Sequence, residues 1–555
     1  MRRLCSLALV VAPIVLLSLL PVRAATVLDM PEFRTDDPDL GGGLKSAYLA
    51  HQDGRYLEAY ATIKRAILDD DPRAWFFLGW LYETGRGTQR NVASAVNAYK
   101  KSAELGNVTA PFRRCNLLLR GTDEQQQEAA EILTKLAETR AADAGLMLGE
   151  AYALGLIGDA PSFEKAQKWW KDSADAGEAR ALINLSLLME GKYGFKEQLN
   201  PDAAIEHLRR ASEIGNAVAM AALGSRFLNG REGLRDEEKG LKWLRQAAAL
   251  NVADADLVLG DHEANQLQNF VQARTHYEAA IKHGSVAALL RLGILSQRGL
   301  GAEANLDAAL KLFKQAAARG SGEGAHLAAS LLLNAKSDTN QAALTAEGYR
   351  FLLAAASQRT AAQVDLALLY LSGRLGVADP VSAAAWFDRA ARLNDPQAQN
   401  NLAALFESGT GVTRNLQSAF NLYRLAARRG HPAATTALGR IHERGIGMEK
   451  DRITAWALYS VAAGLKDKDG ARLLGELTTK LDAIELSAAR KKLDEMKKLP
   501  NPIEKKDEEA TDPAEGADPA EGTDPAEGTT EPAEKAAGPT AEDSPSPLVP
   551  TPDNP

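Results

Sequence analysis

A column of small residues recurs along most of this chain at intervals of 33 to 38 residues. A fixed column of small side chains has a steric cause, because it marks where one helix backbone lies against its partner and a larger side chain would push the two apart. A segment of this length cannot bury an apolar face by itself, so the repeats must stack on one another. The column consists of Gly79, Cys115, Gly149, Ser186, Gly224, Gly260, Gly293, Ser330, Ala367, Ala403, Gly439 and Gly475.

Each repeat has the pattern of two amphipathic helices joined by a short loop. In residues 398–431, Gly409 and Gly411 interrupt a first apolar period and Gly430 ends a second. This pattern predicts an antiparallel helix hairpin. The apolar positions of the second helix are Leu416, Ala419, Phe420, Tyr423 and Ala427.

The chain begins with the pattern of a secretory signal peptide. A basic start is followed by an apolar run over residues 7–20 and a small-residue cleavage signal at Ala24, so residues 1–24 are expected to be removed. No later stretch approaches the roughly 18 apolar residues that a membrane helix needs, so the mature chain is expected to have no membrane span. We therefore expect an exported protein, either periplasmic or extracellular.

The remaining chain divides into three further segments by composition. Residues 25–43 contain a glycine triplet and predict an irregular lead-in, and residues 44–499 carry the repeats. Residues 500–555 contain tandem Asp-Pro-Ala-Glu-Gly sequences, and from Ile503 onward 15 acidic residues outnumber 3 basic ones. Such a composition predicts a disordered acidic tail that acts as a spacer, with docking to a basic partner or a wall polymer as the alternative.

Cysteine content and amino-acid composition both point to packing as the source of stability. Removal of Cys5 leaves Cys115 alone, so no internal disulfide can form. The chain is 45% hydrophobic but only 6% aromatic, which favours close helix packing in an all-α fold. Because Cys115 belongs to the small column, we expect a buried structural thiol and not a nucleophile.

Recurring motifs link the repeats to a known family. Gly-x-Gly loops occur at 85–87, 299–301, 409–411 and 445–447, and the second helices carry aromatic residues at Trp170, Trp243 and Trp386. These motifs resemble the Sel-one-like repeat (SLR) family, a relative of the tetratricopeptide repeats. The resemblance implies a right-handed α-solenoid of about a dozen stacked antiparallel helix pairs. It also implies a scaffold for protein–protein contacts, here in the assembly or regulation of an envelope or secretion complex.

The resemblance further implies where a partner would bind. In tetratricopeptide solenoids the first helix of each pair lines the concave side, and positions one and four residues after the small column point into the groove. For Trp80 the alternative is that its ring packs between neighbouring repeats. The candidate binding residues on this basis are Trp80, Glu83, Gln297, Glu407, Arg440 and Glu443.

The candidate motifs for catalysis, cofactor binding and metal binding each lack a feature that such a site needs. His262 lacks a second histidine four residues later, as a zinc helix would need, and the glycines at 299–301 follow a predicted helix instead of a strand. We therefore expect no enzyme activity, no cofactor and no metal, and the near-neutral repeats disfavour nucleic acid. Two rival functions stay open, a polysaccharide-binding or wall-binding protein and a hydrolase of wall or antibiotic substrates. The exported relatives assigned such hydrolysis carry a cysteine pair in each repeat, which this chain lacks.

Overall fold

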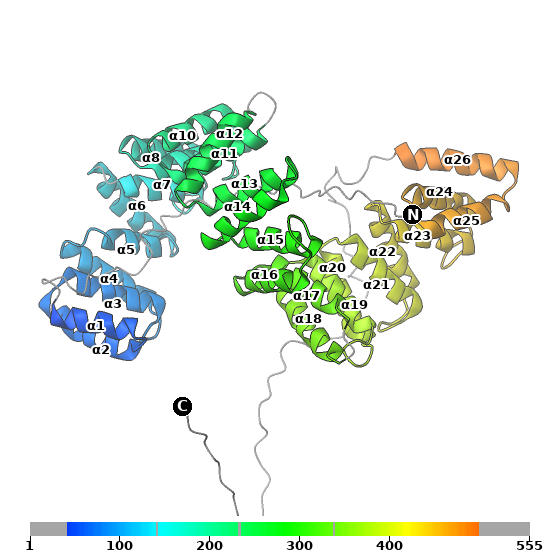
Figure 1. The fold of residues 1–555 in the computed structure, drawn as a ribbon, viewed down its shortest axis with the longest axis horizontal. Helices are drawn as coiled ribbons and strands as arrows, with labels where there is room; N and C mark the ends of the chain where they lie inside the picture. Colours follow the sequence, from blue (N-terminus) through cyan, green and yellow to red (C-terminus); the bar gives the residue numbers. More distant parts are fainter. Residues whose placement is uncertain (1–40, 140–141, 231–234, 337–338, 499–555) are drawn as a thin grey trace, which may run out of the picture. The chain divides into compact units, whose positions relative to one another are not determined.

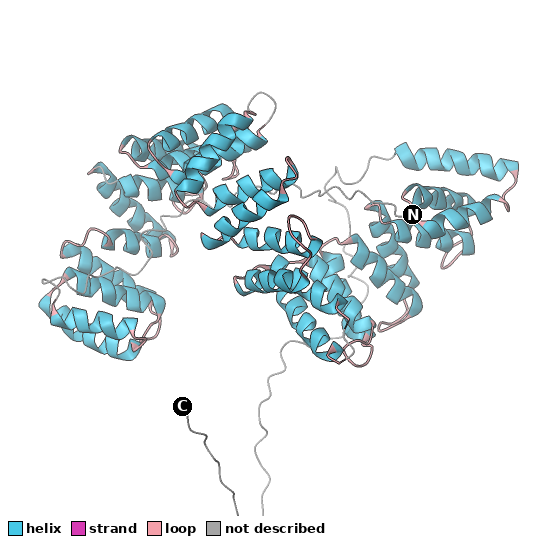
Figure 2. Cartoon of the chain, in the orientation of Figure 1, coloured by secondary structure: helices cyan, strands magenta, loops and turns pink. Residues whose placement is uncertain are grey.

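The computed structural model describes residues 41–139, 142–230, 235–336 and 339–498. The predicted signal peptide, most of the lead-in and the acidic tail lie outside the described residues. Across these four ranges the chain forms 26 α-helices and no strand, in adjacent pairs, as an α-solenoid requires (Figures 1 and 2). The all-α prediction is confirmed, and the first helix starts at Gly42, two residues before the predicted start of the repeats.

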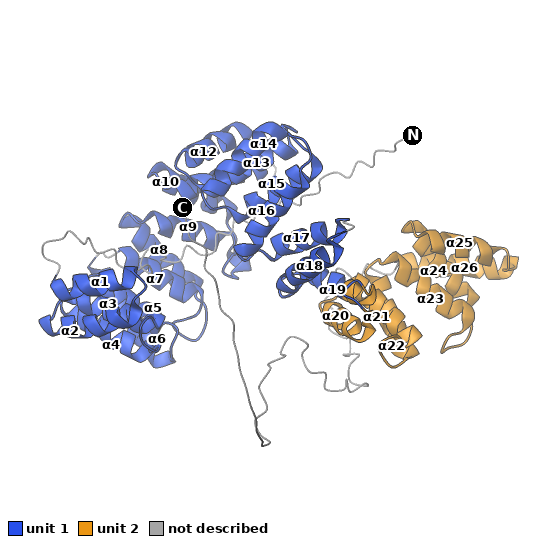
Figure 3. Cartoon of the chain, turned by 60° about the horizontal axis from the view of Figure 1, so that its bottom comes forward, with its two compact units in different colours: residues 1–366, 374–376 blue, residues 367–373, 377–555 orange. Residues whose placement is uncertain are grey.

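The chain divides within helix α19 (Thr360–Leu371) into two compact units (Figure 3). Unit 1 comprises residues 1–366 with 374–376, and unit 2 comprises residues 367–373 with 377–555. The helices of unit 1 are α1 (Gly42–Gln52), α2 (Tyr56–Ala66), α3 (Pro72–Thr84), α4 (Val92–Glu104), α5 (Ala110–Leu118), α6 (Asp123–Glu138), α7 (Ala142–Ala153), α8 (Phe163–Asp175), α9 (Ala179–Met189), α10 (Pro201–Glu213), α11 (Ala217–Asn229), α12 (Glu237–Ala249), α13 (Ala253–Asn265), α14 (Phe270–Lys282), α15 (Val286–Arg298), α16 (Leu306–Ala318), α17 (Gly322–Asn334) and α18 (Gln341–Ala356). Those of unit 2 are α20 (Pro380–Arg392), α21 (Pro396–Ser408), α22 (Leu416–Arg428), α23 (Pro432–Arg444), α24 (Arg452–Gly464), α25 (Lys468–Thr478) and α26 (Ala483–Lys498).

Polar caps fix where the helices of each pair begin. Asn91, Asn305 and Asn415 each accept a hydrogen bond from the backbone N–H three residues on, at the start of a second helix. At the start of first helices, Asp395 accepts from the N–H three residues on and Asp71 from the N–H two residues on, and each is followed by a proline at the first helical position. Such caps satisfy otherwise unpaired N–H groups, so local sequence sets the hairpin geometry before any stacking.

The small column lies where the two helices of a pair touch. A Cβ atom placed on six of its glycines would lie 2.4 to 2.8 Å from a bulky side chain of the following helix, closer than real Cβ contacts allow. The steric interpretation of the column is therefore supported at these positions. The pairs are Gly79 with Tyr99, Gly149 with Trp170, Gly224 with Leu244, Gly260 with Tyr277, Gly293 with Phe313, and Gly439 with Tyr459.

The assignment of two residues to the small column, Ser330 and Gly475, is wrong. Ser330 is exposed, and Ala329, one position earlier, is fully buried in its place. Gly475 is also exposed, with no atom within 4 Å of a Cβ placed on it. The second error has a clear cause, because α26 packs against α24 and not against α25 as the expected terminal hairpin required. Buried Leu477 of α25 and Ala489 of α26 both join the cluster around Tyr459.

The Gly-x-Gly loops connect each pair to the pair before it. The second glycine has a positive φ, and a Cβ on Gly87 would lie 1.9 Å from the carbonyl oxygen of Tyr56, at the start of α2. Gly301 packs in the same way on the backbone of Phe270, and Gly411 on that of Pro380. In these three loops the motif thus packs on the preceding pair as well as turning the chain, whereas at Gly447 the nearest atom, Leu416 Cβ, lies 3.9 Å from the Cβ position.

Candidate functional site

Three of the predicted binding residues are glutamates that accept hydrogen bonds within their own helix pair. Tyr99 Oη donates to Glu83 at 2.6 Å. The same contact joins Tyr423 to Glu407 at 2.8 Å and Tyr459 to Glu443 at 2.9 Å, always over a separation of 16 residues. All three carboxylates are half-buried. Their structural contacts are with the second helix of the pair.

Burial keeps these tyrosines protonated. It raises the pKa of Tyr99, Tyr423 and Tyr459 above the usual value, and the neighbouring carboxylate raises it further. A neutral phenol is a hydrogen-bond donor, so each contact persists across the physiological pH range. The first helix of the pair thus provides both the small residue under the ring and, four residues later, the acceptor for its hydroxyl.

In two places the tyrosine–carboxylate contact extends to the next helix pair through an arginine. The guanidinium of Arg113 on α5 lies 3.5 Å from Glu83 on α3, and only 2% of the arginine side chain is exposed. Asp261 on α13 receives hydrogen bonds from both Tyr277, at 2.8 Å, and Arg291 on α15, at 3.2 Å. These side chains link neighbouring pairs, which is a structural role in the stack.

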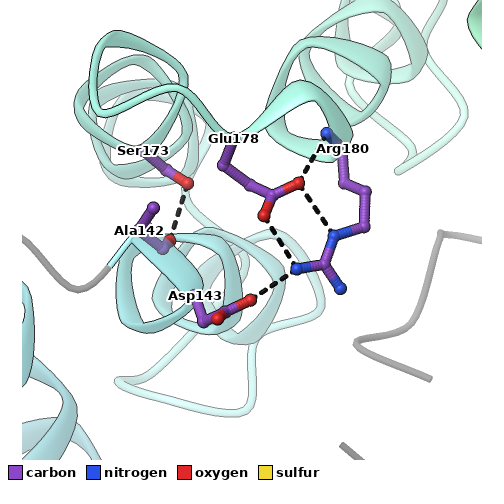
Figure 4. A network of polar contacts seen from close by, with 5 residues as sticks. All are labelled: Ala142, Asp143, Ser173, Glu178 and Arg180. Atoms are coloured by element: carbon purple, nitrogen blue, oxygen red, sulfur yellow. Dashed lines mark hydrogen bonds and ion pairs between the residues drawn. The ribbon is translucent and has the colours of Figure 1, made fainter. Parts of the chain in front are cut away.

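A related network joins α7, α8 and α9 (Figure 4). Arg180 of α9 donates to Glu178 at 2.8 Å and also pairs with Asp143 of α7. Nearby, Ser173 Oγ of α8 donates to the carbonyl oxygen of Ala142 at 2.7 Å. The polar groups of this network contact one another. They link the pair formed by α7 and α8 to α9, the first helix of the next pair.

The other predicted site residues differ in exposure. Gln297 and Arg440 are half-buried. Arg440 lies near Tyr423 and Tyr459, where its charge partly offsets the raised pKa of each phenol. Trp80 is only 5% exposed, and its ring stacks on Phe77 with centroids 6.0 Å apart. This burial agrees with the alternative interpretation of Trp80, in which the indole packs between neighbouring helix pairs.

The surface over Trp80 is formed by a residue that the sequence analysis did not select. Arg86 is exposed, and its Cζ lies 5.0 Å from the ring centroid of Trp80 and 5.5 Å from that of Tyr56. Its Nη1 lies 3.1 Å from Nε2 of His51. We call His51, Tyr56, Trp80 and Arg86 the Arg86 platform. The sequence carried a signal for it, since Leu300, Thr410 and Ile446 occupy the corresponding loop position elsewhere.

A shallow, open pocket of about 720 Å³ adjoins the platform between residues 54–58 and 87–89. A second pocket, beside Tyr277 and Arg291, has a volume of only about 20 Å³. The described residues contain no group of three or more His, Cys, Asp or Glu side chains that could hold a metal ion. Burial raises the pKa of the Cys115 thiol to about 12, so this side chain is a poor nucleophile.

Comparison with known proteins identifies the repeats. Eight segments match the Sel1 repeat and together cover just over half of the chain. The chain belongs to the Sel1 repeat family. Sel1 repeat proteins are generally non-catalytic scaffolds, and their fold is suited to protein–protein interaction. The matching segments are residues 72–107, 142–178, 179–216, 217–252, 286–321, 360–395, 396–431 and 432–467.

Individual relatives of this Sel1 repeat protein are distant. Chitin synthase regulatory factor 3 of Schizosaccharomyces pombe is 23% identical over 45% of this chain and 28% of its own length. An uncharacterized protein of Neisseria meningitidis serogroup B is 29% identical over 30% of this chain and 34% of its own length. The matches thus span about a third of each relative.

Solved structures with similar folds include two bacterial repeat proteins. One is c5321, a protective antigen of uropathogenic Escherichia coli with an SLR fold, which is 24% identical with a TM-score of 0.48. That comparison covers 79% of this chain and 94% of c5321. The other is a Sel1 repeat protein from Oxalobacter formigenes, 25% identical with a TM-score of 0.41, covering 59% and 93% of the two chains. Among the helices that the structure describes, none is long and apolar enough to cross a membrane.

Proposed function

We propose that this Sel1 repeat protein is an exported scaffold that binds protein partners and thereby assembles or regulates an envelope or secretion complex. One observation supports this most strongly: the contacts that build each helix pair stay constant while the residue after the small column changes. Beside Gly293, Ala403 and Gly439 in the column, that residue is a half-buried isoleucine, an exposed alanine and a half-buried arginine. A constant frame with variable chemistry is what partner recognition requires.

The proposed export and regulatory role have separate support. The basic and apolar pattern of residues 1–24 is typical of secretion signals, which supports the proposal that the scaffold acts in the periplasm or outside the cell. One relative is named as a regulatory factor for chitin synthase, which is compatible with a regulatory scaffold here.

Two measurements test the proposal. A fusion of residues 1–60 to alkaline phosphatase should be active outside the cytoplasm, and deletion of residues 7–20 should abolish that activity. Crosslinking of the tagged chain in its own cells, followed by mass spectrometry, should recover a defined set of envelope proteins. Recovery of wall polymer without protein would favour the polysaccharide-binding alternative, and an inactive fusion would refute export.

A further inference from the structure

We propose that the Arg86 platform binds an acidic side chain within an extended, partly apolar segment of a partner protein. This inference rests on the proposed function and adds the chemistry of the segment that is recognised. The observation behind it is that the fold holds Arg86 in place without a carboxylate partner among the residues that the structure describes.

Arg86 is held by its neighbours and not by an ion pair. Its guanidinium lies over the rings of Trp80 and Tyr56, and Nη1 contacts Nε2 of His51 at 3.1 Å. Contacts of a guanidinium with aromatic faces restrict it without using all of its N–H donors. No carboxylate among the residues that the structure describes lies within ion-pair distance of Arg86. Nearby Arg55, by contrast, already pairs with Asp53 at 2.8 Å and Glu58 at 2.6 Å.

His51 fixes the direction of the guanidinium. An arginine N–H can only donate, so Nε2 of His51 must accept and its Nδ1 must carry the proton. Burial, and then the charge of Arg86, lowers the pKa of His51, so the imidazole is neutral at pH 7. The tautomer leaves a buried Nδ1–H without a partner. This arrangement pre-orients Arg86 before any ligand arrives, which reduces the entropy lost on binding.

The fold itself does not require a charge at this position. In the equivalent Gly-x-Gly loops, Leu300 packs against the core cluster around Tyr277, and Ile446 packs against the cluster around Tyr423. An apolar side chain therefore suffices to cover the loop. Arg86 lies over the ring of Trp80 and yet its side chain is exposed, which suits recognition more than packing.

The surroundings favour a peptide over a small free anion. The adjoining pocket is open and shallow, so a single small anion would stay largely hydrated there. Leu57 lines this pocket and is 77% exposed, and the ring of Tyr56 belongs to both the pocket and the platform. A carboxylate on Arg86 with an apolar neighbour over Leu57 and Tyr56 would use both features.

Binding of defined peptides to the purified full chain tests the inference. The probe is a fluorescein-labelled peptide of sequence GSGLELELGSG, compared by anisotropy with GSGLQLQLGSG and with a version carrying phosphoserine in place of both glutamates. The acidic peptide should bind roughly tenfold or more tightly than the glutamine peptide, because a charged, forked hydrogen bond is lost in the latter. Equal binding of the two, no binding of either, or clear preference for the phosphopeptide would overturn the inference.

Matched variants locate the site. Arg86→Leu, which places the residue type of position 300 in this loop, should weaken binding of the acidic peptide roughly tenfold with an unchanged melting temperature. Arg86→Lys keeps the charge but loses the fork, so its binding should be intermediate. Arg65→Leu removes an exposed charge from α2 and should leave binding within about twofold of the parent. Parental binding by both Arg86 variants would exclude the platform.

The two proposals fail in different ways. If the native chain and Arg86→Leu recover the same crosslinked proteins in equal yield, the scaffold function stands and the platform is not its recognition site. If the native chain recovers no protein, the scaffold function itself is refuted.

Discussion

A Cβ atom placed on Gly439 of α23 would lie 2.4 Å from Cε1 of Tyr459 on α24. The hydroxyl of the same tyrosine donates to Glu443, one helical turn after Gly439. The helix spacing and the polar contact therefore depend on each other, since only a small residue at position 439 lets the ring pass over α23 to reach the carboxylate. Tyr99 relates to Gly79 and Glu83 in the same way.

Gly439→Leu should destabilise the protein by about 3 kcal/mol, because the new side chain must displace the buried ring of Tyr459. Thermal unfolding followed by far-ultraviolet circular dichroism measures the change. Gly475→Leu is the matched control, since nothing lies within 4 Å of its Cβ position and its midpoint should move little. Equal midpoints for the two variants would contradict the steric role of the column.

The sequence predicted the helix pairs well because their determinants are local. Caps such as Asn415, the loop glycines and the small column all act within one repeat. The predicted terminal hairpin of α25 and α26 was wrong, because α26 packs on α24. This packing depends on which helix surface the rest of the fold leaves uncovered, and no local sequence pattern indicates that. Glu83 and Trp80 were assigned to a groove by analogy, which stays a prediction, and the analogy did not reveal that they contact Tyr99 and Phe77. A tyrosine 16 residues after a carboxylate recurs in the sequence and could have revealed the first of these contacts.

Glu443→Ala should lower stability by about 1.5 kcal/mol, because the phenol of Tyr459 loses a charged hydrogen-bond acceptor. Glu443→Gln should recover part of the loss, since its amide oxygen can accept in the same position. Urea unfolding measures both variants against Glu449→Ala, which removes an exposed carboxylate from the following loop. If Glu443→Ala unfolds like the parent but captures less partner, the carboxylate serves binding as first predicted.

Stability should fall as the pH drops from about 7 to about 5, before most carboxylates titrate. Burial is the largest cause that lowers the pKa of four histidines below the ordinary value of 6.5, namely His51, His207, His431 and His442. In this window the unfolded chain binds more protons than the folded chain. The contribution of these four histidines to the free energy of unfolding is thus fully present above pH 6.5. It is lost as the pH falls through their lowered pKa values in the folded chain.

The pH dependence is measured as the melting temperature at constant ionic strength. His207→Gln should reduce the loss between pH 7 and pH 5, because one group that titrates differently in the two states is removed. A profile that is flat over this range in the parent protein would show that the buried imidazoles titrate as freely as in the unfolded chain.

Gly87→Ala and Gly447→Ala separate the two roles of the loop glycines. Both residues have a positive φ, near +71° and +73°, so either substitution should cost about 1 kcal/mol of backbone strain. Only at Gly87 would the new methyl group lie 1.9 Å from the carbonyl oxygen of Tyr56, whereas at Gly447 the nearest atom is Leu416 Cβ at 3.9 Å. Relieving that overlap must shift the loop away from α2, which adds roughly 1–3 kcal/mol at Gly87 alone. Chemical denaturation of the two variants should therefore give a clearly larger loss for Gly87→Ala. Equal losses would mean that the loop glycines serve only the turn, and that successive helix pairs are held together by their helices alone.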